Sequence, residues 1–279
     1  MNFIGLPYFY ENYKFNYYFT NLITDHPEKI KINCKIDFFY GAFPWSLWNG
    51  GVNSNQNNQV LYYDIIQSFN KIILDKPIVL DCSNIFLEEI DKFNIYQNII
   101  LKELNESSVY LEISDLTLLN YIKEKYKYYK FIISDNINNI IPLENEKILN
   151  NFLNNDDILK VILPNDFQFL NQIENKNKII LPIGQCYNCN NFKECSIIEQ
   201  KAQVNFSELS KFNSCSIFKF SNYLEEIQYY NNYGINHFKI SPIKGNYNLL
   251  EFNYNLLKSF IKEEYLVDII EECLKEGLI

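Results

Sequence analysis

Short runs of β-branched and aromatic residues alternate along this chain with longer stretches whose apolar positions recur at helical spacing. The short runs predict strands, and the longer stretches predict helices between them. Strands are predicted over residues 35–43, 77–82, 108–114, 130–134, 159–164, 178–184, 216–221 and 236–241. Helices are predicted over residues 59–73, 115–129 and 222–234, with a helical tail over 248–277.

This alternation predicts an α/β fold, and the count of eight strand–helix units favours a single (β/α)8 TIM-type barrel. A doubly wound open sheet is the main alternative, because periodicity does not separate the two folds. The lack of a glycine-rich turn after the first predicted strand favours the barrel. No linker is visible, so residues 1–279 are interpreted as one domain, with an aromatic-rich N-terminal arm over 1–30 and a cysteine-bearing loop and helix over 185–215.

The charge pattern narrows the class of partner. The net charge is −9, the isoelectric point is about 4.9, and the chain contains no arginine. Strong nucleic-acid binding is not expected, because it depends on basic side chains that neutralise phosphates. The N-terminus lacks the pattern of a signal peptide and no apolar run is long enough to span a membrane, so we expect a cytoplasmic protein.

Three of the seven cysteines form the pattern Cys186-x2-Cys189-x5-Cys195, directly after the strand predicted over 178–184. In a reducing compartment such a cluster indicates a metal or redox site rather than disulfides. The fourth ligand is predicted to be Cys82, which ends the strand 77–82 at the same mouth of the barrel. Cys215 ranks second to Cys82, because it precedes a predicted strand and should therefore lie at the end of the barrel opposite the cysteine loop. It is kept as the fallback ligand. Four thiolates suit zinc or an iron–sulfur cluster.

Other candidate residues fall near the carboxyl ends of the predicted strands, where barrels collect functional groups. Trp45, Trp48 and Asn49 lie in the first loop and are predicted to form a wall that closes over a ligand, or else to pack on the rim. Glu112 is a candidate acid–base group, with a structural acid as the alternative. Lys239 is predicted to neutralise a substrate carboxylate or phosphate, or to extend its ammonium to solvent.

Asp115 precedes a helical stretch and is interpreted as its N-cap, an interpretation favoured over catalysis. The two histidines offer little for a metal or nucleophile site, since His26 lies in the arm and His237 opens a strand.

The chain resembles the U32, or collagenase-like, peptidase family, most closely its iron–sulfur members, which take part in oxygen-independent ubiquinone hydroxylation. The resemblance is carried by "VYLEISDLTLLNYI" (109–122), the block over 159–195 with its cysteines, and "YGINHFKISP" (233–242), which is similar to the family's Gly-x-x-x-Phe-Lys-Ile signature. It implies a barrel with four cysteines around a [4Fe–4S] cluster, one of them after an early strand, in agreement with Cys82. Ser-Pro-Ile stands here where the family has Glu-Gly-Arg.

Together these observations predict an enzyme with a cysteine-bound [4Fe–4S] cluster. Its expected role is modification, such as hydroxylation, of a small or partner-delivered substrate, with Glu112 and Lys239 as catalytic residues. The alternative is a zinc-stabilised barrel that acts as a binding or assembly subunit without chemistry of its own. A homo-oligomer and a hetero-oligomer both agree with the sequence.

Overall fold

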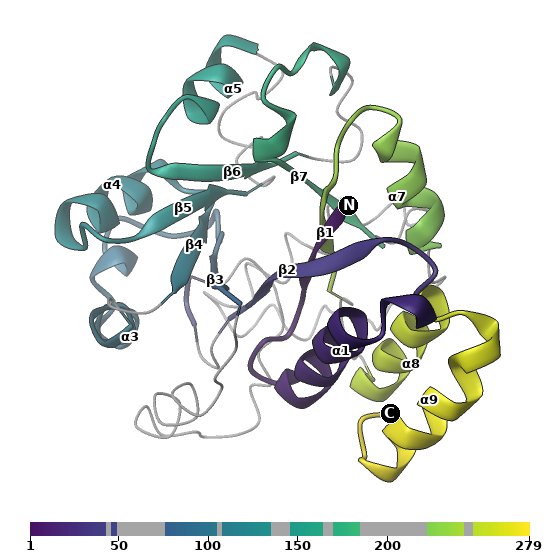
Figure 1. The fold of residues 1–279 in the computed structure, drawn as a ribbon. Helices are drawn as coiled ribbons and strands as arrows, with labels where there is room; N and C mark the ends of the chain where they lie inside the picture. Colours follow the sequence, from purple (N-terminus) through teal and green to yellow (C-terminus); the bar gives the residue numbers. More distant parts are fainter. Residues whose placement is uncertain are drawn as a thin grey trace.

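The structure is a computed structural model that describes residues 1–42, 46–48, 76–104, 108–134, 146–163, 170–184, 222–242 and 248–279. Eight parallel strands close into a barrel in chain order, and each strand pairs with the next (Figure 1). The strands are β1 (Asn2–Leu6), β2 (Cys34–Gly41), β3 (Ile78–Cys82), β4 (Val109–Ile113), β5 (Lys130–Ile133), β6 (Ile158–Ile162), β7 (Ile179–Ile183) and β8 (His237–Ile240). The predicted (β/α)8 fold is therefore confirmed.

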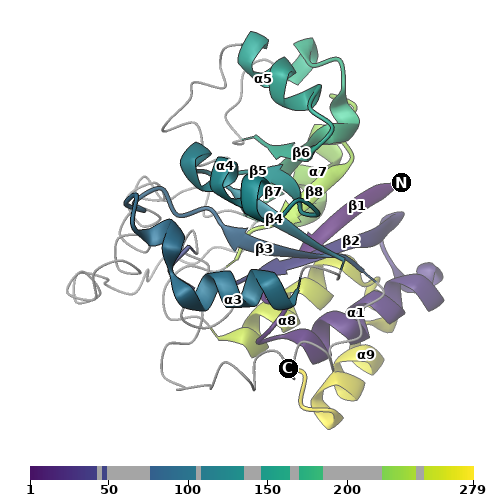
Figure 2. The same ribbon diagram turned by 90° about the vertical axis from the view of Figure 1, so that its left-hand side faces the viewer.

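Helices surround the barrel, and α1, α8 and α9 gather on one side of it in both views (Figures 1 and 2). The α-helices are α1 (Tyr13–Asp25), α3 (Ile95–Glu103), α4 (Leu116–Lys125), α5 (Glu146–Leu153), α7 (Tyr223–Asn231), α8 (Leu249–Phe260) and α9 (Glu263–Lys275). The short 3-10 helices are η1 (Pro27–Lys29), η2 (Asp91–Phe93), η4 (Leu170–Gln172) and η5 (Lys176–Lys178).

The prediction of an N-terminal arm over residues 1–30 was wrong, because this segment contains the first strand and the first helix of the barrel. β1 pairs with β2 on one side and with β8 on the other, so it closes the ring. Its sequence signal is weak because Gly5 interrupts a run of only five residues. A Cβ atom on Gly5 would lie 2.3 Å from Cζ of Phe38, so the strand needs glycine where this ring fills the interior.

Two further elements differ from the prediction. The strand predicted over 216–221 lies outside the described residues, and β7 pairs directly with β8, so the ring closes without it. The helical tail is two helices rather than one, because Ile261 leaves the helical conformation to form a bridge with Ile30. The helix predicted over 59–73 also lies outside the described residues.

The outer helices are joined to the loop that follows β1. The side chain of Asn12, in this loop, donates to Oδ1 of Asn253 on α8 at 2.7 Å. The same Asn253 donates to the carbonyl of Leu278, beyond the end of α9, also at 2.7 Å. These bonds satisfy amide groups that are buried between α1, α8 and the last residues of the chain.

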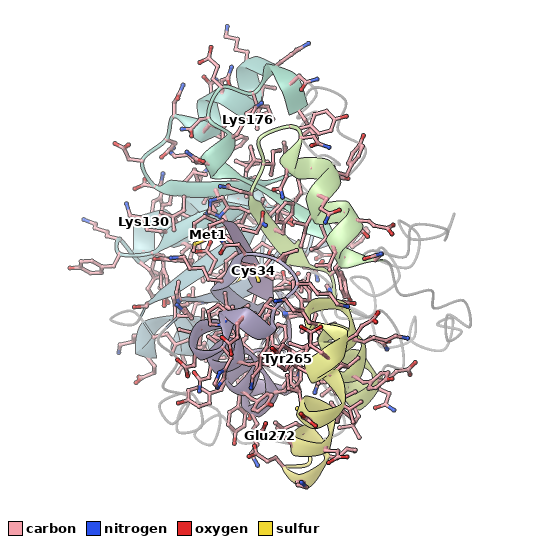
Figure 3. All side chains as sticks on the ribbon, turned by 45° about the vertical axis from the view of Figure 1, so that its right-hand side comes forward. Met1, Cys34, Lys130, Lys176, Tyr265 and Glu272 are labelled. Carbon is pink, nitrogen blue, oxygen red and sulfur yellow. The ribbon has the colours of Figure 1, made fainter. Side chains whose placement is uncertain are left out.

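The two ends of the barrel are defined by the common direction of the strands. Met1, Cys34 and Lys130 lie at the end where strands begin, which we call the floor (Figure 3). The opposite end, where strands finish, is the mouth, and the loops after β1, β3, β4 and β7 leave the barrel there.

Between mouth and floor, side chains alternate along each strand between the interior and the helix layer. Residues paired in register lie on the same face of the sheet. By this rule the buried side chains that point inward fill the middle of the barrel with apolar atoms, and they include Phe38, Ile132, Ile162 and Ile180.

Candidate active site

The mouth of the barrel contains a buried ion pair that crosses the interior. Lys239 of β8 and Glu112 of β4 belong to strands on opposite sides of the ring, and Nζ lies 2.5 Å from Oε2. Glu112 is 2% exposed and Lys239 is 9% exposed. The two residues that sequence reasoning chose as catalytic candidates, 127 positions apart, are thus in direct contact.

Tyr40 of β2 packs its ring against the ammonium of Lys239. The ammonium of Lys239 lies 4.2 Å from the centre of the Tyr40 ring, within the range of a cation–π interaction. The hydroxyl of Tyr40 donates to the carbonyl of Ile240, the residue next to the lysine. Burial raises the pKa of Tyr40 well above its usual value, and the nearby Tyr8, Glu112 and Asp81 raise it further. Tyr40 is therefore a neutral phenol that fixes the position of the ammonium.

The carboxylate of Glu112 is held at both oxygens. While Oε2 accepts from Lys239, Oε1 accepts from the hydroxyl of Ser134, just beyond β5, at 3.1 Å. A second buried carboxylate, Asp81 of β3, is the register partner of Glu112. Oδ1 of Asp81 accepts from the backbone N–H of Ser83 at 3.0 Å and from its hydroxyl at 2.5 Å.

This arrangement places two carboxylates and one ammonium in a shielded environment at the functional end of the fold. Inside a protein such charges interact more strongly than in water, because the surroundings screen them less. The Lys239 ammonium can donate hydrogen bonds to an oxygen of a substrate, and the Glu112 carboxylate can accept a proton when its ion pair opens. The site is thus equipped to bind a polar group and to move a proton next to it.

Glu11, in the loop after β1, is a further titratable group on the mouth side, and sequence reasoning missed it. Burial raises its pKa to about 7, against a weaker opposing effect of its own backbone N–H. Its Oε1 is buried and has no hydrogen-bond partner among the residues that the structure describes. Sequence reasoning assigned the residue to an arm. The signal that could have revealed it is one acid inside the aromatic run "PYFYENY".

The aromatic wall predicted from Trp45, Trp48 and Asn49 is described only in part, because Trp45 and Asn49 lie outside the described residues. Trp48 is fully buried, and its indole N–H donates to the carbonyl of Asp91 at 3.0 Å. The carbonyl of Trp48 accepts from the backbone N–H of Asn84. These contacts favour packing on the rim over ligand binding for Trp48.

Of the predicted metal ligands, only Cys82 lies within the described residues; Cys186, Cys189, Cys195 and the fallback Cys215 do not. Cys82 follows Asp81, which shares the inner face with Glu112, so alternation turns the Cys82 side chain toward the helix layer. Burial raises the pKa of this thiol well above its usual value, with further increases from Asp81 and Glu112. The orientation of the side chain toward the helix layer weighs against Cys82 as a ligand at the mouth.

The starting point of the cysteine loop is well defined at Gly184, the last described residue before it. Gly184 has φ +77°, and a Cβ atom there would lie 2.0 Å from Cε1 of Tyr223 on α7. Its backbone N–H donates to Glu226 of the same helix at 3.0 Å. Only glycine suits this combination of backbone conformation and close approach. Across the described ranges, no group of three or more His, Cys, Asp or Glu side chains is placed to hold a metal ion.

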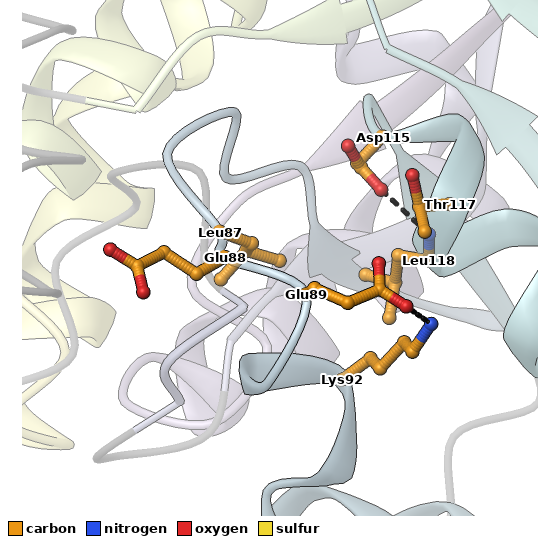
Figure 4. A pocket seen from close by; sticks show the side chains of 7 residues that line it. All are labelled: Leu87, Glu88, Glu89, Lys92, Asp115, Thr117 and Leu118. Carbon is orange, nitrogen blue, oxygen red and sulfur yellow. Dashed lines mark hydrogen bonds and ion pairs between the residues drawn. The ribbon is translucent and has the colours of Figure 1, made fainter.

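A small pocket lies beside the mouth, between the loop after β3 and the start of α4 (Figure 4). It is lined by Leu87, Glu88, Glu89, Lys92, Asp115, Thr117 and Leu118. Asp115 accepts from the backbone N–H of Leu118 at 2.6 Å, which confirms it as the N-cap of α4. The pocket is small, with a volume of about 40 Å³, and Glu112 and Lys239 are not among its lining residues.

The floor contains a second polar cluster that links three strands. Nζ of Lys160 on β6 lies 2.6 Å from Nδ1 of His237 on β8 and 3.6 Å from Oδ2 of Asp37 on β2. Burial opposes ionisation of Asp37, but the hydrogen bond with His237 and the charge of Lys160 outweigh it and lower the pKa. Burial lowers the pKa of Lys160, partly offset by Asp37. Phe3 stacks on His237, with ring centroids 4.5 Å apart.

Comparison with protein-family models, with curated proteins and with solved structures found no match to this chain. Within the part of the chain that the structure describes, no helix has both the length and the apolar character to cross a membrane. The functional interpretation therefore rests on the sequence and on the geometry of the mouth.

Proposed function

We propose that this protein is an enzyme that modifies a small or partner-delivered substrate at the mouth of its barrel, with Glu112 and Lys239 in contact with the substrate. The observation that carries this proposal is the buried ion pair between them. Removing two such charges from water costs several kcal/mol per ion, and apolar residues of similar size often give equal or greater stability. A function beyond stability explains why a costly pair lies at the end where barrel enzymes hold their active sites.

The roles of the two residues follow from their surroundings. Tyr40 and Glu112 hold the Lys239 ammonium in one position, so its remaining N–H groups are oriented before a substrate arrives. When a substrate oxygen draws the ammonium away from Glu112, the carboxylate becomes free to accept a proton from the substrate. Ser134 keeps the carboxylate in place during this exchange. The reaction class that this arrangement suits is proton transfer beside a polarised oxygen.

A cysteine-bound iron–sulfur cluster is the finer part of the proposal. It is supported by the C-x2-C-x5-C spacing and by the resemblance to the iron–sulfur members of the U32 family. Such a cluster would supply one-electron transfer, which suits oxygen-independent hydroxylation. The orientation of Cys82 does not fit a cluster at the mouth. Because β7 pairs directly with β8, Cys215 does not directly precede a barrel strand, and the reason for assigning it to the opposite end no longer applies. We therefore propose Cys186, Cys189 and Cys195 with Cys215 as the fourth ligand.

Metal content tests the cluster. The protein is purified without oxygen, and iron, sulfide and zinc are measured together with the visible absorption spectrum. We expect a coloured protein with iron and sulfide. We also expect Cys215→Ser to lose most of its iron, while Cys82→Ser keeps it. A colourless protein loaded with zinc would instead support the alternative of a zinc-stabilised binding or assembly subunit.

Substrate binding tests the mouth. A collection of small metabolites is screened by thermal shift against the native protein and against the double variant Glu112→Gln/Lys239→Met, which keeps the volume of the pair without its charges. We expect some compounds to stabilise the native protein and not the variant. If every stabilising compound acts equally on both proteins, the mouth is not the substrate site and the proposed function fails.

A further inference from the structure

The substrate group that the mouth recognises can be inferred from hydrogen-bond donors that have no acceptor among the described residues. Lys239 has three N–H donors, and Glu112 Oε2 is its one hydrogen-bond acceptor among the described residues. The Tyr40 ring covers one side of the ammonium without accepting a conventional hydrogen bond. Lys239 is buried, at 9% exposure, and an ammonium in such a position with unused donors is ready to bind an acceptor.

Ser114 supplies a second, independent observation. It lies two residues beyond Glu112, and alternation places it on the same inner face, toward the mouth. Its side chain is fully buried, and its Oγ has no hydrogen-bond partner in the part of the chain that the structure describes. A buried hydroxyl without a partner costs about 1 to 3 kcal/mol, so a missing ligand is a direct explanation. Two donors near Glu112 therefore lack acceptors.

The charge of the site restricts what this acceptor can be. Glu112 already compensates the positive charge of Lys239, so an anionic ligand would gain little attraction and would face the Glu112 carboxylate. A cationic ligand would face the ammonium and would offer donors where acceptors are needed. A neutral oxygen with lone pairs suits both unused donors.

We infer that the mouth binds a neutral carbonyl oxygen, as in a ketone or an amide, through hydrogen bonds from Lys239 and Ser114. This inference rests on the proposed function and specifies the substrate class of the same site. Tyr40 is a positioning residue in this arrangement, because it holds the ammonium that donates to the carbonyl. The step is binding alone, and no bond is formed or broken.

Three small probes of the same shape separate the possible charges. Acetamide, acetate and acetamidinium are planar and nearly isosteric, with net charges of about 0, −1 and +1 at neutral pH. Their dissociation constants are measured by ligand-observed NMR with the full-length native protein. We expect acetamide to bind about fivefold or more tightly than either ion, since one unpaired polar contact changes affinity by about that factor.

Variants identify the groups that make the contact. Ser114→Ala is expected to weaken acetamide binding about threefold to tenfold, the effect of one hydrogen bond. The double variant Glu112→Gln/Lys239→Met is expected to remove the preference for acetamide. Ser259→Ala and Lys262→Met are the matched controls. Ser259 bonds a carbonyl within α8, and Lys262 lies between α8 and α9 and donates to the carbonyl of Glu28, so both should leave binding unchanged.

The inference is overturned if acetate or acetamidinium binds most tightly, if no probe binds, or if Ser114→Ala leaves acetamide binding unchanged. Far-ultraviolet circular dichroism confirms that each variant is folded. Failure of this inference is distinct from failure of the proposed function. Metabolites that bind the native protein and not the double variant would keep the mouth as the substrate site even if the three probes show no preference for the neutral one.

Discussion

Each end of the barrel contains an ion pair between a lysine and a carboxylate, and the two pairs lie in different surroundings. At the mouth, the side chains of Lys239 and Glu112 are 11% and 3% exposed. At the floor, the side chains of Lys160 and Asp37 are 19% and 30% exposed. Both pairs join strands on opposite sides of the ring, so topology does not distinguish them. The two pairs differ in how much of each side chain is exposed to water.

This difference indicates what each pair contributes. Water reaches the floor pair more than the mouth pair, so the floor pair is expected to add less to stability and to cost less to keep. The mouth pair is shielded, so its charges attract strongly but have also lost their hydration. Replacing one residue of a buried pair lowers the free energy of unfolding strongly, because the other charge stays buried without a partner. Replacing both residues with apolar ones of similar size costs much less. The expected effects below, from the largest to the smallest, test this contrast.

Breaking the mouth pair is expected to have the largest effect. Lys239→Met leaves the Glu112 carboxylate buried without its cation, which is expected to lower the free energy of unfolding by about 3 to 5 kcal/mol. Glu112→Met/Lys239→Met removes both charges and is expected to recover most of that loss. Urea denaturation of the native and variant proteins measures both values. Equal losses in the single and double variants would show that the pair is not an electrostatic unit.

Glu11, also buried on the mouth side, is expected to make the free energy of unfolding depend on pH. Its pKa is raised to about 7 by burial, so the folded protein keeps a proton that the unfolded chain loses above pH ~4.5. The stability that this group provides is present below the unfolded pKa and is lost as pH rises through about 7. Each pKa unit is worth about 1.4 kcal/mol, so the loss is on the order of 3 kcal/mol.

The variant Glu11→Gln should not show this loss. We expect its free energy of unfolding, relative to the native protein, to increase by about 3 kcal/mol between pH 4.5 and pH 8. Urea denaturation across this range measures the difference, and Glu28→Gln, an exposed acid at the floor, is the control. A difference between Glu11→Gln and the native protein that does not change with pH would contradict the buried, protonated state of Glu11.

Asp115 lies on the mouth side and has a structural role, so the effect of replacing it provides a reference for the effects at Glu112 and Lys239. Asp115→Ala removes the side chain that caps α4 and is expected to cost about 1 kcal/mol. Asp115→Asn keeps a capping oxygen and is expected to cost less. Thermal and urea unfolding measure both variants. A loss of substrate binding in Asp115→Asn, with stability preserved, would instead give this residue a functional role.

Breaking the floor pair is expected to have the smallest effect. Lys160→Met removes the ammonium beside Asp37 and His237, at a cost below about 1 kcal/mol because the pair is partly exposed. The effect should shrink further in high salt, unlike that of Lys239→Met. Urea denaturation at two salt concentrations makes the comparison. A loss as large as that of Lys239→Met would mean that burial is not what separates the two ends.

The sequence predicted most of the fold because its strands are buried on both faces and therefore appear as continuous apolar runs. Seven of the eight predicted strands match strands of the barrel within a few residues. The sequence did not predict β1, because its Gly5 is explained by the aromatic side chain of Phe38, which lies beside it only in the closed barrel. It also joined α8 and α9, because the bridge between Ile30 and Ile261 is a tertiary contact.

The candidate site was predictable as a set of residues but not as a geometry. Glu112 and Lys239 are recognisable from their positions near strand ends, while their contact depends on the closure of the ring. The orientation of Cys82 depends on strand register, where a shift of one residue reverses the side. Sequence reasoning chose its position along the barrel axis and did not consider the face of the strand on which it lies.

The bonds that Asn253 makes have a practical consequence for handling the protein. Through this one amide, the carbonyl of Leu278 is joined to Asn12, in the loop that also contains Glu11. A fusion tag attached after Ile279 would therefore begin one residue from a hydrogen bond that leads to a loop at the mouth. A tag attached before Met1, which is 61% exposed at the floor, would extend from the far end of the barrel and leave the proposed chemistry untouched.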